Sequence, residues 1–121
     1  MYDNSYSKLL KDIAATKPLS QKEEKTFFEL YSKTHDKLIR DKIVKANMRF
    51  VLKTALAYKN TSVDMSDIIV AGSTGLVKAV ENYDVTRGLR FMTYALYWIK
   101  SYIHSAIEQH KNLIAIPWNQ A

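Results

Sequence analysis

Arg90–Lys100, which reads RFMTYALYWIK, places four aromatic side chains between two cations in a run that favours a helix. With a period of 3.6 residues, an aliphatic stripe that is expected to face the core runs through Ala95, Ile99, Ile103 and Ala106. Tyr94, Tyr97 and Ser101 lie away from the centre of this stripe. Trp98 lies at its border, so the helix carries more aromatic surface than its buried side requires.

These rings outside the stripe fit two different roles. Flat rings next to Arg90 and Lys100 suit a surface that stacks unpaired bases and holds phosphates. The same tyrosines would also suit the edge of a buried stripe, where each ring packs and its hydroxyl stays in water. This helix alone fits both roles, so the choice depends on the rest of the chain.

The composition is that of a single folded domain. The chain has 121 residues, of which 47% are hydrophobic and 25% charged, enough to bury a core of its own. Only 3 Gly and 2 Pro favour long helices with few tight turns. The absence of Cys excludes disulfides, thiolate zinc sites and a cysteine nucleophile. No apolar run approaches the roughly 20 residues of a membrane span and no signal-peptide core is present, so a cytoplasmic protein without membrane contacts is expected.

The charge distribution suggests two partners, one negatively and one positively charged. The formal net charge is +6. Residues 41–59 and 85–121 are net positive, whereas residues 60–84, which lie between them, are net negative. Different faces of the molecule could therefore attract a polyanion such as nucleic acid and a basic surface of another protein. A basic charge by itself is a weak indication of nucleic-acid binding.

Every segment with a readable period is helical, which predicts an all-α fold, a compact bundle of about five helices. The expected helices are Tyr6–Ala14, Ser20–Thr34, Lys37–Lys59, a helix capped by Asp64 or Ser66 that runs to Tyr83, and the aromatic helix to about Lys111. Ser20 and Glu23 form the pattern of a capping box. Asn60–Val63 is expected as a loop, Asp84–Gly88 as a turn, and Ile116–Trp118 as the end of regular structure.

Two of these helices have inward faces that follow the i, i+3, i+4, i+7 pattern. On the helix from Lys37 the inward positions are Ile43, Val44, Met48, Val51, Leu52, Ala55 and Leu56. On the next helix they are Met65, Ile68, Ile69, Gly72, Leu76, Ala79, Val80 and Tyr83. Gly72 and Gly75 cost that helix up to about 1 kcal/mol each relative to Ala. They therefore predict the close approach of a neighbouring helix.

The order and spacing of these residues resemble a known family. The motif consists of Asp67-Ile68-Ile69, Gly72, Gly75-Leu76, Ala79-Val80, Tyr83-Asp84, Arg87-Gly88, Phe91, Thr93-Tyr94-Ala95 and Trp98-Ile99. It resembles region 2 of the bacterial sigma factors of the sigma-70 family. Asn47-Met48-Arg49-Phe50-Val51 resembles the start of the long helix that precedes this motif in the family. Pro18-Leu19-Ser20 with Glu23-Glu24 resembles region 1.2, so the resemblance spans nearly the whole chain.

The resemblance implies one sigma-like domain over residues 1–121. Residues 1–36 would form the region 1.2-like helix pair, residues 37–112 the helices of region 2, and residues 113–121 the start of a linker to downstream regions. The parts of the family that read the extended −10 motif and the −35 element are missing from this sequence. It is therefore expected to be either a fragment of a longer sigma factor or a minimal phage-type sigma factor that relies on a coactivator.

In this family the domain binds core RNA polymerase and melts the −10 promoter element by capturing bases of the non-template strand. By resemblance, a pocket for a flipped adenine is made of Tyr83, Asp84, Arg87, Thr93, Tyr94 and Tyr97. A second pocket for a later base is made of Asn47, Phe50 and Met92. The DNA backbone would be held by Arg49, Lys53, Arg90 and Lys100, and the expected DNA-binding set is completed by Phe91, Trp98, Ser101 and His104. Stacking is worth about 1–3 kcal/mol per base, so two pockets could offset the opening of a short A·T-rich bubble.

The acidic segment would bind the polymerase. In the family, the helix that corresponds to Asp67–Val80 docks on a coiled coil of the largest, clamp-bearing subunit. The residues at contact positions are Asp67, Ser73 and Val77. Val70 and Ala71 stand where the family has a polar Gln-Glu pair, so weaker or altered binding to the core enzyme is expected. Asp67 also suits the N-terminal end of a helix, where the dipole favours a carboxylate by about 0.3–1 kcal/mol.

On the DNA side the sequence departs from the family at several positions. Tyr97-Trp98 stands in place of a tryptophan pair, and Leu89 stands in place of an aromatic residue. Ser101 and His104 replace the Gln and Thr that the family uses at the upstream edge of the −10 element. The base preference at that edge therefore stays open.

No arrangement of residues indicates an enzyme, a metal site or a cofactor. His35, His104 and His110 are scattered and have no acidic partner at a suitable spacing. Gly72 and Gly75 do not form a phosphate-binding loop. These patterns argue against catalysis.

A second interpretation belongs to a different class of protein. The chain could be an interaction module that occupies the sigma-docking site of a host RNA polymerase and inhibits or redirects the enzyme without reading DNA. Such a module has no use for Tyr94, Tyr97 and Arg87 beside one another. Those residues favour promoter recognition.

Overall fold

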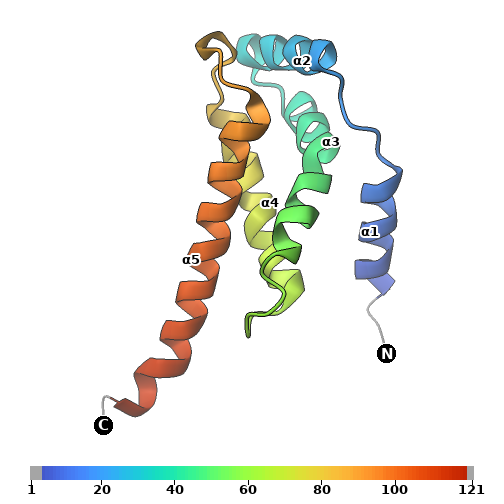
Figure 1. Cartoon of the computed structure of the whole chain (residues 1–121). Helices are drawn as coiled ribbons and strands as arrows, with labels where there is room; N and C mark the ends of the chain where they lie inside the picture. The colour runs from blue at the N-terminus through green and yellow to red at the C-terminus, as the bar shows by residue number, and fades with distance from the viewer. Residues whose placement is uncertain (1–3, 120–121) are drawn as a thin grey trace.

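The computed structural model describes residues 4–119, which form five α-helices and one short 3₁₀ helix. These elements are α1 (Asn4–Ala15), α2 (Gln21–Thr34), α3 (Lys37–Leu56), α4 (Met65–Asn82), η1 (Val85–Arg87) and α5 (Phe91–Asn119). In Figure 1, α3, α4 and α5 run side by side, α2 lies across one end of them and α1 lies beside α3. The predicted all-α fold class is confirmed.

The central helix is α4, which packs against both α3 and α5. Glycines allow this close packing. A Cβ atom at Gly75 would lie 2.6 Å from the carbonyl oxygen of Trp98, and one at Gly72 would lie 3.0 Å from Cγ1 of Val51. The close approach of neighbouring helices that the two glycines predicted is confirmed.

The core is built from one face of each of α2, α3, α4 and α5. Its buried side chains are Phe28, Ile43, Val51, Ala55, Ile68, Ile69, Leu76, Ala79, Val80, Phe91, Ala95, Ile99, Ile103 and Ile107. Of the other predicted core positions, Val44, Met48, Leu52, Met65 and Tyr83 are half-buried and pack against this core. Leu56, the last residue of α3, is 58% exposed, which differs from the prediction. Ala106 is half-buried, whereas its neighbour Ile107 is buried.

Capping side chains fix the starts of α2 and α3. The Ser20 hydroxyl accepts from the Glu23 amide (3.2 Å), and Glu23 Oε1 accepts from the Ser20 amide (3.0 Å), as the capping-box pattern predicted. Asp36 caps α3 and accepts a hydrogen bond from the Leu38 amide (2.8 Å). The expected end of α3 at Lys59 is wrong. From Ala57 onwards the amides donate to carbonyls three residues back, so the chain leaves the α-helix after Leu56.

The expected end of the aromatic helix at about Lys111 is also wrong, because α5 continues to Asn119. Pro117 lies within its last turn, where a proline removes one backbone hydrogen bond without ending the helix earlier. None of the helices in the described part of the chain is both long enough and apolar enough to span a membrane.

Candidate nucleic-acid interface

Polar side chains fix the turn between α4 and α5. Asp84 accepts hydrogen bonds on Oδ1 from the amide (2.9 Å) and the hydroxyl (2.6 Å) of Thr86. Arg87 Nε lies 3.6 Å from the other carboxylate oxygen. The hydrogen bonds from Thr86, with a smaller effect of the Arg87 charge, lower the pKa of Asp84, so its carboxylate stays ionised. Gly88 has a φ of 77°, a left-handed conformation that suits glycine and turns the chain into α5.

This turn forms one wall of a cavity of about 410 Å³ at the start of α5. The residues that line this cavity are Asn82, Tyr83, Asp84, Arg87, Leu89 and Tyr94. We call it the Tyr94 cavity. It brings together four of the six residues that were expected to capture an adenine, with Thr93 and Tyr97 exposed on α5 outside its lining. Asn82 and Leu89 were not expected there.

Tyr83 connects the Tyr94 cavity with the core. Its ring lies 4.7 Å from that of Phe28, 5.2 Å from that of Phe91 and 5.7 Å from that of Tyr94. Its hydroxyl donates a hydrogen bond to the Leu89 carbonyl. Burial raises the pKa of Tyr83, so the hydroxyl stays protonated and keeps this bond. The ring is therefore a fixed wall of the cavity.

A row of aromatic rings follows α5. Tyr94, Trp98 and Tyr102 are spaced four residues apart, and the ring centroids of successive members lie 6.3 Å apart. Trp98 is half-buried, in agreement with its predicted border position. Tyr102 was not predicted as part of this row, although its spacing from Trp98 would have indicated it.

An open groove of about 690 Å³ runs along the exposed side of α5. Its lining residues are Tyr97, Lys100, Ser101, His104, Ser105, Glu108, Gln109 and Asn112. Four of the expected DNA-binding residues, from Tyr97 to His104, therefore share one surface. The His104 Nε2 atom lies 3.0 Å from the Tyr58 hydroxyl, and the two rings meet edge to face. Tyr58, in the turn that follows α3, was not predicted as a partner of this groove.

Two residues expected to bind DNA lie inside the fold. Phe91 is 1% exposed and packs against Phe28 and Tyr83, so its ring is part of the core. Asn47 is 8% exposed, and its amide donates to the Ile43 carbonyl (2.8 Å). Neither side chain can contact a base directly in this structure, because both are covered by protein.

The other two members of the expected second pocket have different surroundings. Phe50 on α3 is 38% exposed. Met92 in the first turn of α5 is half-buried and packs against the core. With Asn47 engaged in its own helix, the pocket of Asn47, Phe50 and Met92 stays a prediction.

The expected phosphate-binding cations are on the surface. Lys53, Arg90 and Lys100 are exposed. Arg49 is exposed as well, but its guanidinium donates a hydrogen bond of 2.6 Å to the Ala14 carbonyl in the last turn of α1. Arg49 therefore holds α1 in this structure.

The residues expected to contact the polymerase lie along α4. Asp67 and Val70 are exposed, Val70 by 63%, and Ala71, Ser73 and Val77 are half-buried. The Ser73 hydroxyl donates to the Ile69 carbonyl (2.7 Å), so it can offer a partner only its oxygen as an acceptor.

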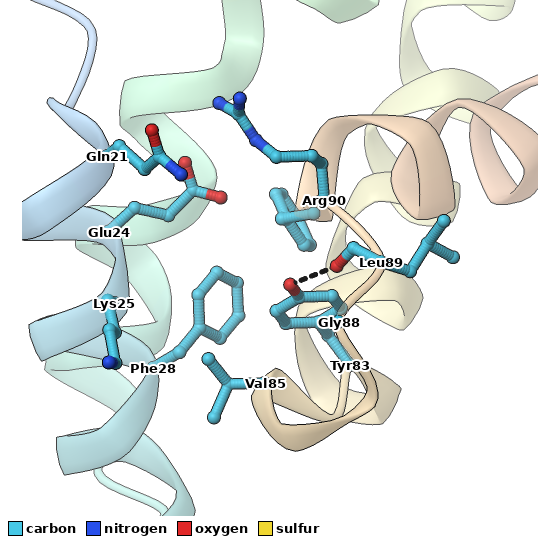
Figure 2. A pocket seen from close by; sticks show the side chains of 10 residues that line it. Gln21, Glu24, Lys25, Phe28, Tyr83, Val85, Gly88, Leu89 and Arg90 are labelled. Carbon is cyan, nitrogen blue, oxygen red and sulfur yellow. Dashed lines mark hydrogen bonds between the residues drawn. The ribbon is translucent and has the colours of Figure 1, made fainter.

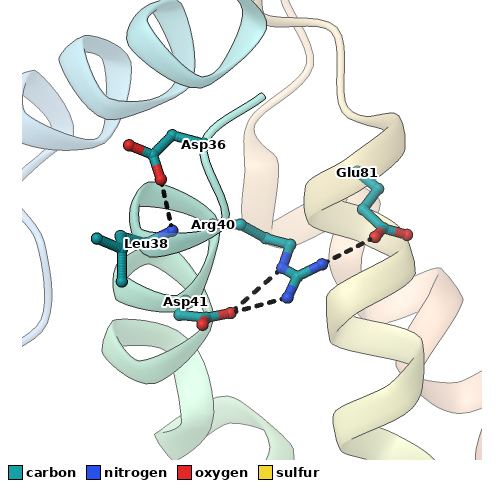
Figure 3. A network of polar contacts seen from close by, with 5 residues as sticks. All are labelled: Asp36, Leu38, Arg40, Asp41 and Glu81. Atoms are coloured by element: carbon teal, nitrogen blue, oxygen red, sulfur yellow. Dashed lines mark hydrogen bonds and ion pairs between the residues drawn. The ribbon is translucent and has the colours of Figure 1, made fainter. Parts of the chain in front are cut away.

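An ion-pair network, shown in Figure 3, joins the C-terminal end of α4 to α3. On α3, the Arg40 Nη2 atom lies 3.2 Å from Oδ1 of Asp41. The Arg40 Nη1 atom lies 3.4 Å from Oε2 of Glu81 on α4. Because Asp41 orients the Arg40 guanidinium from within α3, the contact with Glu81 is the one that links the two helices. Such a partly exposed ion pair adds little to the packing of α4 against α3.

Comparison with known proteins relates this chain to one family and to several of its members. The family Sigma-70 region 2 matches residues 43–112. RNA polymerase sigma-B factor from Myxococcus xanthus is 40% identical over 79 residues, which are 65% of this chain and 32% of that protein. RNA polymerase sigma-C factor from the same organism is 33% identical over 118 residues, which are 98% of this chain and 40% of that protein. RNA polymerase sigma factor SigA4 from Synechococcus elongatus is 40% identical over 78 residues, 64% of this chain and 25% of that protein.

The family match covers more than half of the chain and includes α4, the turn and every residue that lines the groove on α5. This chain spans no more than 40% of the length of these three relatives. The match nevertheless includes all four predicted residues that line the Tyr94 cavity. The chain therefore belongs to the sigma-70 family of RNA polymerase sigma factors.

Proposed function

We propose that this chain binds core RNA polymerase through α4 and opens −10-like promoter DNA by capturing an unpaired base of the non-template strand in the Tyr94 cavity. The observation that supports this most strongly is the composition of that cavity. Two tyrosine rings, an ionised carboxylate and a guanidinium line one space at the surface.

Each of these groups suits a flipped adenine. A ring of Tyr83 or Tyr94 offers a face for stacking, worth about 1–3 kcal/mol per base. The Asp84 carboxylate can accept a hydrogen bond from the exocyclic amino group of the base, and Arg87 can donate to a ring nitrogen or to the phosphate. Stacking and these polar contacts together favour a base that has left the duplex.

The groove on α5 would hold the DNA next to the opened segment. Tyr97 presents a ring to solvent, and Lys100 supplies positive charge in the same groove. Lys53 and Arg90 add cations on neighbouring surfaces. Contacts of these cations with phosphates release counterions, so the affinity should fall as the salt concentration rises.

The exposed side of α4 would bind the clamp coiled coil of the polymerase's largest subunit. We expect Asp67→Arg to abolish co-elution with core polymerase in size-exclusion chromatography, because it reverses the charge of an exposed residue in the first turn of α4. Glu29→Arg, an equal charge reversal on an exposed position of α2, is the matched control and should leave binding intact. Co-elution of Asp67→Arg at the parent's level would show that α4 is not the docking helix.

Base capture predicts a preference for one strand. The complex with core polymerase should bind single-stranded non-template −10-like DNA more tightly than duplex or the complementary strand, as measured by fluorescence anisotropy. Equal affinity for all three, together with intact binding to core polymerase, would instead support the interaction module that occupies the docking site without reading DNA. Run-off transcription with and without the chain then separates an initiation factor from an inhibitor.

A further inference from the structure

Tyr83 and Tyr58 use their hydroxyl groups in different places. The Tyr83 hydroxyl donates to the Leu89 carbonyl in the segment that leads into α5, as Figure 2 shows. The Tyr58 hydroxyl, in the turn that follows α3, lies 3.0 Å from Nε2 of His104, which lines the open groove on α5. The first hydrogen bond holds the fold together, whereas the second holds a titratable side chain at the surface.

Tyr58 gives His104 a fixed support. The Tyr58 ring is half-buried and packs against the core, and it meets the imidazole edge to face, with an angle of 90° between the ring planes. His104 itself is exposed, so without this contact its imidazole would turn about its side-chain bonds. The hydrogen bond and the ring contact together fix the orientation of the imidazole.

The same hydrogen bond determines which nitrogen of the imidazole is left for a ligand. A tyrosine hydroxyl can donate to Nε2 of a neutral imidazole and accept from the Nε2–H of a charged one. In the first case the single ring proton is on Nδ1, and in the second case both nitrogens carry a proton. With Tyr58 bound to Nε2 in this way, Nδ1 of His104 is a donor both before and after protonation.

The groups around His104 make this part of the groove suitable for an anion. Lys100 and Ser101 lie one turn before His104 on α5 and line the groove with it. Glu108, one turn after His104, also lines the groove, and its Oε1 atom lies 3.7 Å from Nζ of Lys111. From the other elements that the structure describes, the tyrosine hydroxyl is the titratable group that faces the imidazole. A cation and two kinds of hydrogen-bond donor therefore share one turn of α5.

We propose that Tyr58 is a positioning residue, which holds His104 so that its Nδ1–H donates to a phosphate of the DNA in the groove on α5, and that this contact takes up a proton. This inference rests on the DNA binding proposed above. A phosphate oxygen accepts from either form of the imidazole, but a charge-assisted hydrogen bond is about twice as strong as a neutral one. DNA in the groove therefore favours the protonated ring, and its affinity rises as the pH falls through the range in which histidine changes charge. The family pattern has Thr at this position, and a hydroxyl takes up no proton, so this linkage is particular to this chain.

The first experiment compares the chain with His104→Gln, each bound to core polymerase. The probe is −10-like DNA with a duplex upstream of a single-stranded non-template segment, and its affinity is measured by fluorescence anisotropy. From about pH 8 to about pH 6 the affinity should rise about fivefold more for the parent than for His104→Gln. The comparison cancels the titration of the polymerase itself. His110→Gln, which removes a histidine of α5 outside the groove lining, is the matched control and should keep the full rise. Equal rises in the parent and in His104→Gln would overturn the proposal.

A double-mutant cycle tests the role of Tyr58. Tyr58→Phe keeps the ring that contacts the imidazole but removes the hydroxyl, so it should lose most of the pH-dependent rise. In the His104→Gln background the same substitution should leave the DNA affinity unchanged, because no imidazole remains to be oriented. If Tyr58→Phe keeps the parent's rise, or weakens binding equally in both backgrounds, Tyr58 does not act through His104 and the proposal is wrong.

Neutral methylphosphonates identify the group on the DNA. They replace single phosphates, one at a time, along both strands of the upstream duplex. At one position the replacement should remove the pH-dependent rise of the parent and leave His104→Gln unaffected. A rise that survives at every position would show that His104 contacts a base instead of a phosphate, which contradicts the proposal.

The Tyr94→Ala variant separates failure of this inference from failure of the proposed function. If Tyr94→Ala weakens the binding of single-stranded −10-like DNA while the parent shows no rise that depends on His104, only this inference is wrong. If Tyr94→Ala has no effect either, base capture itself is wrong.

Discussion

Tyr97 and Trp98 are adjacent in the sequence, yet the structure holds them in different ways. Tyr97 is 77% exposed and lines the groove on α5. Trp98 is half-buried between Tyr94 and Tyr102, and its backbone carbonyl lies against Gly75 of α4. One ring is therefore available to a ligand, whereas the other also packs the helix against its neighbour.

Truncating each ring separates these two roles. Tyr97→Ala should leave the melting temperature unchanged but lose about 1–3 kcal/mol of bubble stabilisation, since its ring stacks only in the DNA complex. Trp98→Ala should lower both the melting temperature and promoter opening, with about 2 kcal/mol lost from folding. Thermal melts and permanganate footprints with core polymerase measure the two effects. Loss of folding in Tyr97→Ala, or promoter opening at the parent's level, would mean that this ring is not a DNA contact.

The capping box gives a prediction about pH. Hydrogen bonds from the backbone and side chain of Ser20 lower the pKa of Glu23 below its ordinary value of 4.5. A carboxylate with a lowered pKa adds stability above its unfolded value, and this stability is lost as the pH falls through the folded value. Glu23→Gln keeps an acceptor at every pH, so the decline of its melting temperature below pH 4.5 should be shallower than the parent's. Parallel acid limbs in circular-dichroism melts would contradict this.

For single residues, the sequence predicted contacts between residues close together in the chain better than contacts between distant segments. The motif identified Tyr83, Asp84, Arg87 and Tyr94 as one site, because all four lie within the turn and the start of α5. The hydrogen bond between Tyr58 and His104 joins the turn after α3 to α5, so no local sequence pattern predicted it. Phe91 was assigned to DNA by its place in the motif, which does not reveal the side of the helix that is buried.

At the scale of the helices, spacing and capping predicted which elements exist, and packing decided where they end. The start of α2 follows from Ser20 and Glu23, two residues that interact locally. The end of α3 follows from a tight turn of residues 57–59 that no single side chain signals. The extension of α5 past Lys111 was missed because Ile116–Trp118 was expected to end regular structure, whereas these residues lie within the last turns of α5.

The contact between α4 and α5 depends on Gly75 more than on Gly72. A Cβ atom at Gly75 would meet backbone atoms of Trp98 and Ile99 at 2.6–2.9 Å, and backbone cannot move aside easily. At Gly72 the nearest atom belongs to the Val51 side chain, at 3.0 Å. Gly75→Ala should therefore destabilise the fold by about 1–3 kcal/mol or more. Gly72→Ala should cost less, because the gain in helix propensity of about 1 kcal/mol offsets a smaller shift.

Chemical unfolding of both glycine variants measures this difference. The free energy of unfolding should be lowest for Gly75→Ala, whereas that of Gly72→Ala should stay close to the parent's. Equal stabilities of the two variants would contradict the argument that the backbone contacts at Gly75 cost more than the side-chain contact at Gly72.

For the whole molecule, stability is unevenly distributed. The helices α3, α4 and α5 share the core, whereas α1 packs against α3 through few groups. Among the side chains of α1 that the structure describes, Ile13 is the buried one, and Arg49 donates to the Ala14 carbonyl. Elements with few buried apolar contacts open first, so α1 should exchange its amide hydrogens fastest among the helices.

Arg49 links this uneven stability to DNA binding. Its guanidinium holds the end of α1 at 2.6 Å in the free protein, and the same group was expected to hold a phosphate. Arg49→Ala should speed amide exchange throughout α1 several-fold while lowering the global free energy of unfolding by only about 1 kcal/mol, since one hydrogen bond from a charged group is lost. Hydrogen-exchange mass spectrometry resolves the two effects.

Lys53→Ala, which removes an exposed cation from the last turn of α3, should leave α1 protected. If the phosphate and the Ala14 carbonyl compete for Arg49, binding of −10-like DNA by the polymerase complex should loosen α1 in the parent as the substitution does. Unchanged protection of α1 in both experiments would show that Arg49 neither anchors α1 nor couples it to DNA.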